Sequence, residues 1–450
     1  MREDLDLLIK NVNIVRSGGI KVGDIGIKDG KIVSPLATAK RLINASGLYA
    51  LPGLIDTHMH IRAPGINHRE TFFSGTSAAA AGGITTIFEM PVSKPATHNA
   101  ELLQQRIEVA AQEAVVDFTF YGAAGYDNVE EIASLAKAGV IGFKTFSQRA
   151  VPGREKEFTG LTTPTSGDLY KVCDEVAKTG LILAVHAESD PLIELFMKDE
   201  RYRKYAGAPY YARPQIVEID AIARAIVIGK ETGARLSMCH VSNPEGVELI
   251  HRMRACGQEV YIESCLHYFE GSEDDVIRLG VWAKLKPPLR KKEELPRMLR
   301  LFRDGYIDML GSDHAPFTRE EKLAPGMPDG LAAVEMTLPI LLKRVKTGEF
   351  TLERIAECAS ERPAKIFGIY PRKGNLDVGA DADIVLVDMD RSHTVNVENC
   401  FTMAKDSVRL YEGCETGGEI IMTIVRGLPV LENGKITAKP GWGKWIVPKK

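Results

Sequence analysis

The sequence predicts an α/β protein, a (β/α)8 TIM barrel with a small β-sandwich domain built from both chain ends. Eight short apolar runs alternate with helical patterns through the middle of the chain. Both ends carry the alternating apolar and polar residues typical of strands. Histidine, lysine or aspartate follows several of the central runs, where the strands of a barrel end. The length of 450 residues suits one large domain and one smaller domain.

The two chain ends are expected to fold together. Residues 3–50 contain short alternating runs and the turn dipeptide Asp29-Gly30, and the same pattern returns in 382–388 and 420–426 before Asn433-Gly434. The sequence therefore predicts one small β domain from residues 1–50 and 375–450.

Residues 51–374 are predicted to form the barrel. Helical patterns such as 100–116 and 214–233 separate the apolar runs, and the Thr- and Pro-rich segment 160–167 is predicted to be a loop. The eight strands are expected near residues 50–56, 84–90, 117–122, 140–144, 181–186, 235–240, 258–263 and 307–311.

Polar residues that bind metals stand at the ends of these runs. His58 and His60 close the first run, and residues i and i+2 of a strand point to the same side, so both imidazoles can face one cation. Later runs end in Lys144, His186, His240 and Asp313. Each residue alone has an ordinary explanation, such as a surface lysine or a helix N-cap. Together, at the same end of the predicted barrel, they indicate a metal site.

These motifs resemble those of the cyclic-amide hydrolases of the amidohydrolase superfamily, a group that includes hydantoinases and dihydropyrimidinases, allantoinases and dihydroorotases. The similarity covers nearly the whole chain, and the tracts 116–122, 240–250 and 367–374 look most like L-selective hydantoinases. It implies hydrolysis of the C–N bond of a small cyclic ureide or imide by a metal-bound hydroxide. The motifs are His58-Met-His60, Gly142-Phe-Lys144, Val185-His186-Ala-Glu188, Cys239-His240-Val-Ser242 and Gly311-Ser-Asp313-His314.

The resemblance also implies the ligands of two divalent metal ions. His58, His60, Lys144 and Asp313 would hold the buried ion, while Lys144, His186 and His240 would hold the exposed one. An ammonium repels cations, and in the resembling families this lysine carries a CO2-derived carbamate that bridges the metals. Histidine and oxygen ligands suit Zn²⁺, and would also admit manganese, cobalt or iron. Asp313 would serve as the catalytic base and then as the acid.

The sequence specifies the residues that contact the substrate less completely than it specifies the metal ligands. Arg62 matches the arginine that holds the substrate carboxylate in dihydroorotases, or it pairs with a nearby acid. The asparagine that completes the dihydroorotase clamp is replaced by Val92-Ser93, so a neutral ring is expected: a hydantoin or dihydropyrimidine first, then allantoin, then dihydroorotate. His314 is either a substrate contact or a satisfied loop histidine. By resemblance, Ser264 and Gly330 would offer backbone groups to the ring.

Composition narrows the remaining classes of function and cellular location. A net charge of −3 gives no sign of binding to nucleic acid or membrane, and the polar, acidic start and the absence of a long apolar stretch predict a cytoplasmic protein. Seven cysteines without CxxC spacing suit reduced thiols, and Cys239 is expected to pack on the side opposite His240. The resemblance implies a homotetramer. A mononuclear deaminase and a non-catalytic dihydropyrimidinase-like scaffold are the alternatives, and the six intact ligands disfavour the scaffold.

Overall fold

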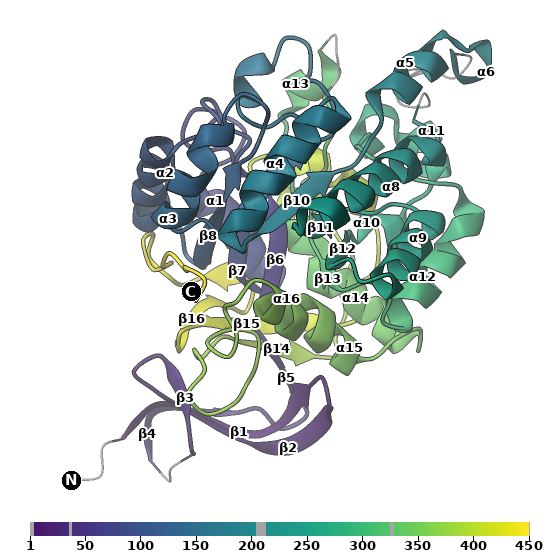
Figure 1. Ribbon diagram of the computed structural model, residues 1–450. Helices are drawn as coiled ribbons and strands as arrows, with labels where there is room; N and C mark the ends of the chain where they lie inside the picture. Colours follow the sequence, from purple (N-terminus) through teal and green to yellow (C-terminus); the bar gives the residue numbers. More distant parts are fainter. Residues whose placement is uncertain (1–3, 36–37, 204–212, 325–327, 450) are drawn as a thin grey trace.

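The computed structural model describes residues 4–35, 38–203, 213–324 and 328–449. Two sheets organise the described chain (Figure 1). Eight parallel strands form the barrel, in sequential order from β6 to β13, and nine strands from the two chain ends form a mixed sheet. The predicted fold class is confirmed.

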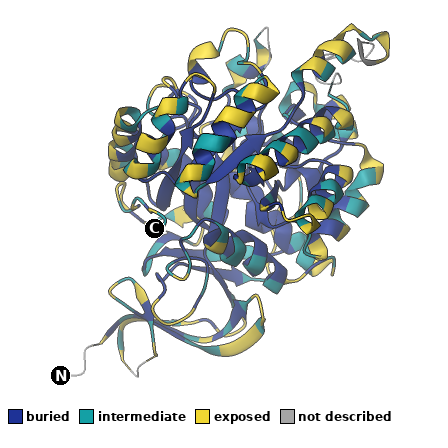
Figure 2. Ribbon diagram, viewed as in Figure 1, coloured by how far each residue is buried: buried dark blue, intermediate teal, exposed yellow. Residues whose placement is uncertain are grey.

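The barrel strands are buried at nearly every position, because side chains fill the barrel on one side and helices cover the other. Figure 2 shows this as a dark blue centre inside helices whose outer faces are exposed. The strands are β6 (Leu54–Met59), β7 (Ile84–Glu89), β8 (Asp117–Ala123), β9 (Gly142–Phe146), β10 (Ile182–His186), β11 (Arg235–Met238), β12 (Val260–Ser264) and β13 (Met309–Leu310).

The barrel closes between its first and last strands through the segments that follow them. Met59 and His314 form a parallel bridge, and the N–H of His60 donates to the His314 carbonyl at 2.8 Å. The Asp56 carboxylate accepts from both the N–H and the hydroxyl of Ser312. The end of β6, which carries His58, is thereby joined to the segments that carry His60 and Asp313.

Several of the outer helices begin at a residue whose side chain caps the helix. Asn99, Thr165 and Asn243 accept backbone N–H groups at the starts of α2, α4 and α9. The helices predicted over 100–116 and 214–233 are confirmed as α2 and α8. The longer helices are α1 (Phe72–Ala81), α2 (Ala100–Glu113), α3 (Ile132–Ala138), α4 (Ser166–Thr179), α5 (Asp190–Lys198), α8 (Gln215–Thr232), α9 (Pro244–Ala255), α11 (Glu273–Leu279), α12 (Leu295–Arg303) and α14 (Thr337–Lys346).

Short helical pieces lie in the connecting loops and near the carboxyl end. Among the described residues, no helix combines the length and apolar character needed to span a membrane. The short pieces are α6 (Glu200–Arg203), α10 (His267–Glu270), α13 (Arg319–Leu323), α15 (Leu352–Ala356), α16 (Arg362–Ile366), η1 (Val129–Glu131), η2 (Glu155–Glu157), η3 (Gly280–Ala283), η4 (Lys292–Glu294), η5 (Val334–Met336), η6 (Glu357–Glu361), η7 (Val397–Asn399) and η8 (Lys405–Tyr411).

The mixed sheet joins the two chain ends. Strand β5 pairs in parallel with β1 and antiparallel with β14, so it links the amino-terminal strands to the carboxyl-terminal ones. Its strands are β1 (Leu5–Arg16), β2 (Gly19–Lys28), β3 (Lys31–Val33), β4 (Ala39–Asn44), β5 (Tyr49–Pro52), β14 (Ile384–Asp388), β15 (Glu419–Val425), β16 (Leu428–Glu432) and β17 (Lys435–Ile436).

The predicted strand near 50–56 proves to be two strands in two sheets. Strand β5 belongs to the mixed sheet and β6 to the barrel, with Gly53 between them. A Cβ at Gly53 would lie 2.2 Å from the Thr85 hydroxyl, so only glycine permits this close crossing. A buried ion network reinforces the junction, because Lys373 pairs with Asp117 of β8 at 2.5 Å and with Asp383 at 2.6 Å.

Candidate metal centre

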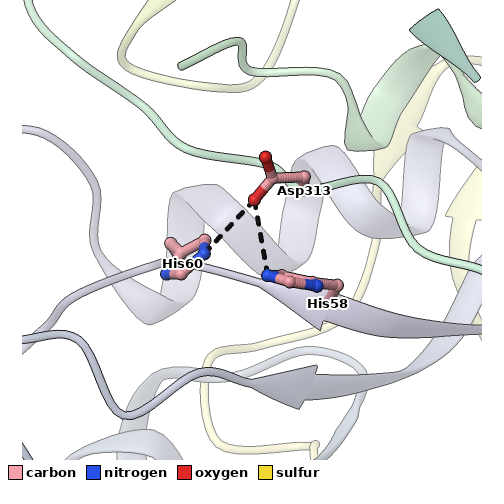
Figure 3. A group of neighbouring side chains, drawn as sticks. All are labelled: His58, His60 and Asp313. Carbon is pink, nitrogen blue, oxygen red and sulfur yellow. Dashed lines mark ion pairs between the residues drawn. The ribbon is translucent and has the colours of Figure 1, made fainter. Parts of the chain in front are cut away.

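Three of the predicted ligands converge where β6 and β13 end (Figure 3). Oδ1 of Asp313 lies 3.4 Å from His58 Nε2 and 3.3 Å from His60 Nε2. Zinc–ligand bonds of 2.0–2.1 Å at tetrahedral angles place two ligand atoms about 3.3 to 3.4 Å apart. Both imidazole nitrogens therefore already stand at ligand spacing from the carboxylate oxygen, and all three ligand atoms lie within 4.8 Å of one another.

A second pair of ligands meets at the ends of β10 and β11. His186 Nδ1 and His240 Nε2 face each other at 3.1 Å. The other nitrogen of His186 contacts Glu188 at 2.8 Å, and this carboxylate is in turn held by Arg213. A carboxylate on the outer nitrogen fixes the tautomer and ring orientation of a metal-binding histidine. His186 is thus presented through Nδ1 and His240 through Nε2.

Lys144 lies near both groups. Its side chain is completely buried, its charge acts on His58, His186 and His240, and its ammonium donates to Cys239 Sγ at 3.1 Å. In the described part of the chain no carboxylate forms an ion pair with it. Burial removes the hydration of this ammonium, and the charge of the Glu263 carboxylate, whose pKa Lys144 helps to lower, offsets that cost without a direct ion pair. The imidazoles and the Asp313 carboxylate around Lys144 are a donor set that fits divalent cations.

Glu263 is a functional residue that the sequence did not reveal. From the end of β12, its Oε1 contacts His58 Nδ1 at 2.7 Å, and its Oε2 accepts from the Thr57 hydroxyl at 2.6 Å. Its Oε1 also accepts the N–H of His240 at 3.2 Å. One carboxylate thus orients residues of both ligand groups. The available signal was a single acid inside the apolar run Val260–Ser264.

The thiol of Cys239 faces this centre, contrary to the orientation expected from strand alternation. It packs in the barrel interior but also accepts from Lys144 and lies near His58 and Glu263. Strand β11 ends at Met238, and His240 adopts a left-handed φ of 39°, so the two neighbours turn to the same side. Asp313 has a similar φ of 45°. Such backbone conformations in non-glycine residues are costly and concentrate at functional sites.

The protonation states mostly match those of metal ligands. Burial lowers the pKa of His60 well below its usual value, and burial together with the His186 and Lys144 charges does the same for His240. Burial alone would raise the pKa of Asp313, but the His60 contact and the surrounding imidazoles hold it well below its usual value. Burial and Lys144 oppose protonation of His58, yet Glu263 raises its pKa to about 10. A metal on His58 Nε2 would replace that proton.

A cavity of about 380 Å³ opens over the ligands. His58, His60, His186, His240 and Asp313 line its floor. Arg62 and Gly330 also line the cavity. The N–H of Gly330 donates to Lys284 O at 2.9 Å, and its carbonyl accepts from Lys322 at 2.6 Å, so this backbone is held in place beside the cavity.

The other two proposed substrate contacts lie outside the cavity lining. The Ser264 hydroxyl is buried and donates to Val241 O at 2.8 Å. His314 is fully buried, with Nε2 3.3 Å from Glu70 and Nδ1 accepting the N–H of Val334 at 3.4 Å. Of the two interpretations of His314, this arrangement favours a loop histidine whose ring nitrogens are both hydrogen-bonded within the protein.

Comparison with known proteins agrees with the geometry. The model of the Amidohydrolase family matches residues 49–435. The chain is 36% identical to the L-hydantoinase of Paenarthrobacter aurescens over 98% of each chain, and 36% identical to the allantoinase of Solibacter usitatus over 99% of this chain and 97% of that one. The solved L-hydantoinase (dihydropyrimidinase) of Arthrobacter aurescens superposes with a TM-score of 0.93 at 36% identity, covering 98% of this chain and 100% of that one. A D-hydantoinase structure matches with a TM-score of 0.89 at 29% identity over 99% of each chain.

Proposed function

The chain belongs to the amidohydrolase family and is a hydrolase of cyclic amides, and from this premise we propose that it opens cyclic ureides or imides at a binuclear metal centre. Hydantoins and dihydropyrimidines are the leading ring class. The allantoinase relatives make allantoin the second candidate, ahead of dihydroorotate. The observation that carries the proposal is a pair of adjoining ligand groups near Lys144: His58, His60 and Asp313 form one, and His186 with His240 forms the other.

In this proposal the two groups hold two divalent ions, with Zn²⁺ favoured by the imidazole and carboxylate donors. Lys144 belongs to both sets, as a carbamate formed with CO2. Its burial, its closeness to His58, His186 and His240, and the absence of an ion pair between it and any described carboxylate support this modification. When bound, the ions supply Lewis acidity that polarises the amide carbonyl and makes water a nucleophile at neutral pH.

The protein residues then position and move protons. Asp313 directs Oδ1 at His58 and His60, and Oδ2 is the oxygen that accepts a proton from the attacking water and returns it to the departing amide nitrogen. Glu263 and Glu188 keep the outer nitrogens of His58 and His186 occupied, so that the inner nitrogens face the cavity. Gly330, held by Lys284 and Lys322, offers backbone atoms to the ring at the cavity wall.

Three wider expectations accompany the proposal. The barrel comprises residues 51–374 and the β domain residues 1–50 with 375–450; the change of sheet between β5 and β6, at Gly53, lies close to the first of these boundaries. The protein acts in the cytoplasm, and it assembles as a homotetramer.

Turnover of a substrate panel, measured together with metal content, tests the proposal. Purified protein supplied with Zn²⁺ and bicarbonate is assayed spectrophotometrically with hydantoin, dihydrouracil, allantoin and dihydroorotate. Ring opening of at least one member, with close to two metals per chain, is expected. One metal per chain and deamination of a heterocycle would replace the proposal with a mononuclear deaminase. Protein that retains no metal and opens no ring would instead be a scaffold.

A further inference from the structure

A buried arginine joins the chain segments that follow β10 and β11. Arg290 is 8% exposed and lies in the loop between η3 and η4. Its guanidinium donates in three directions, from Nε to the Ser242 hydroxyl, from Nη1 to the Arg213 carbonyl and from Nη2 to the Glu218 carboxylate, each at 2.8 Å. Ser242 lies after β11, whereas Arg213 precedes α8 and Glu218 lies in its first turn. One side chain therefore connects both segments.

Glu218 strengthens the connection from α8. This carboxylate is 2% exposed, and its Oε1 accepts the N–H of Ser242 at 2.9 Å. Its Oε2 accepts from the Ser242 hydroxyl and, at 2.8 Å, from the Asn243 side-chain amide. Asn243 in turn caps α9. Because these charged contacts are buried, water cannot replace a partner that is lost, and they fix the loop after β11.

Arg213 extends the connection to a predicted metal ligand. Its carbonyl accepts from Arg290, and its guanidinium pairs with Glu188. Glu188 is fully buried and contacts the outer nitrogen of His186 at 2.8 Å, while the inner nitrogen faces His240. The orientation of His186 therefore depends on where Arg290 holds Arg213.

His240 depends on the same connection through its backbone. Its φ of 39° is left-handed, and Glu263 accepts its N–H at 3.2 Å. Two residues later, Glu218 binds the N–H of Ser242. The segment that carries His240 is thus anchored at both ends. A left-handed backbone is costly for a residue other than glycine, and it persists where the surrounding contacts impose it.

The ligand group at the ends of β6 and β13 has other supports. Glu263 contacts His58 at 2.7 Å, and Glu89 accepts the two N–H groups that follow His60, at 2.8 and 2.9 Å. Within the described chain, the side-chain hydrogen bonds of Arg290 go to its three partners around α8 and β11, and none reaches the segments after β6 or β13.

We propose that Arg290 and Glu218 are positioning residues for one of the two metal ions, the ion held by His186 and His240. The inference rests on the proposed binuclear centre and specifies how half of that centre is held. Residues behind metal-binding histidines set affinity by fixing the orientation of the ligands. Loss of the connection should therefore release this ion, while His58, His60 and Asp313 keep theirs.

Metal content measures this selectivity. Arg290→Lys keeps the charge but loses the planar fork that reaches three partners at once. Wild type and variant are equilibrated with Zn²⁺ against a graded series of chelator concentrations, and Zn²⁺ per chain is determined by plasma emission spectrometry. In the variant the affinity for one ion should fall by about 10- to 100-fold, and that for the other should change by less than about threefold.

Single-site backgrounds identify the ion that is weakened. His60→Asn removes a ligand of the first group, so the ion that remains reports the second group, and His186→Asn does the reverse. Adding Arg290→Lys should weaken the remaining ion by about 10- to 100-fold in His60→Asn and by less than about threefold in His186→Asn. Equal weakening in both backgrounds would overturn the inference.

Arg354→Lys is the matched control. Arg354 is 7% exposed and also makes three hydrogen bonds, to the carbonyls of Phe302 and Ile307 and to Glu357. These partners lie before β13 or after α15, at the end of the barrel away from the ligands. The control should bind both ions within about twofold of the wild type, even if its unfolding temperature falls as far as that of Arg290→Lys.

Ser242→Ala makes a smaller change and keeps the test decisive if Arg290→Lys does not fold. It removes the hydroxyl between Arg290 and Glu218 and should weaken the same ion by about 3- to 10-fold. Saturating Zn²⁺ should return kcat of both variants to within about threefold of the wild type, because every ligand is intact. Unchanged affinities, or equal weakening of both ions, would overturn the inference and leave the proposed function standing. A wild type that holds fewer than two ions would overturn both.

Discussion

Replacing Glu263 with glutamine should weaken metal binding without abolishing the fold. Glutamine has the same size and can still accept from His58 Nδ1 and donate toward Thr57, but it carries no charge. The carboxylate bonds His58 at 2.7 Å, Thr57 at 2.6 Å and the His240 N–H at 3.2 Å. All three contacts are buried, so water cannot replace the lost charge.

The size of the effect follows from these contacts. A hydrogen bond to a charged group contributes about 1.5–3 kcal/mol, whereas a neutral one contributes about 0.5–1.5 kcal/mol. If the hydrogen bonds from Glu263 to His58 and to the His240 N–H lose their charge, the metal-bound state is therefore destabilised by about 2 kcal/mol. That corresponds to roughly 10- to 100-fold weaker metal binding, the range typical for carboxylates behind metal-binding histidines.

Competition with a chelator measures this affinity directly. Wild type and Glu263→Gln are titrated with Zn²⁺ against a chelator of known affinity, and kcat is measured at saturating metal. Glu335→Gln controls for the substitution itself: it exchanges another buried glutamate, one that its raised pKa of about 8 keeps mostly protonated near neutral pH, and it should leave metal affinity unaltered. Unchanged affinity in Glu263→Gln, or an equal weakening in the Glu335 variant, would refute the assigned role of Glu263.

Three further predictions address other residues. Lys144→Ala should lose both metals and several powers of ten in kcat together, with part of the rate restored by short carboxylic acids and bicarbonate; full metal content with near-normal kcat would contradict the carbamate. Asp313→Asn should reduce metal content modestly and kcat by about 10² to 10⁴-fold, and retention of more than about a tenth of kcat would mean that another residue carries the proton. Burial beside Glu70 raises the pKa of Glu335 from 4.5 to about 8, so the folded protein keeps this proton over a range in which the unfolded chain has lost it. Stability relative to Glu335→Gln should therefore fall as pH rises from 4.5 to 8, by at most about 5 kcal/mol, and parallel urea-unfolding profiles for the two proteins between these pH values would disprove it.

Several structural features depended on contacts that no local pattern specifies. Glu263 and His58 are 205 positions apart, and only barrel closure brings the carboxylate to the imidazole. Cys239 was placed on the wrong side because alternation holds only while the strand continues, and β11 ends one residue earlier. The partners of His314 likewise became visible only once the segments after β6 and β13 were assembled.

The sequence by itself determined the fold class, the barrel strands and the residue types at their ends. These follow from local periodicity and side-chain chemistry: apolar runs of strand length mark buried parallel strands, and histidine, lysine and aspartate at their ends mark a metal site. The tertiary structure decided how those residues are oriented and which charges are compensated. The orientation of a side chain and the pairing of its charge depend on distances between residues far apart in the chain. The closed barrel and its cavity set those distances.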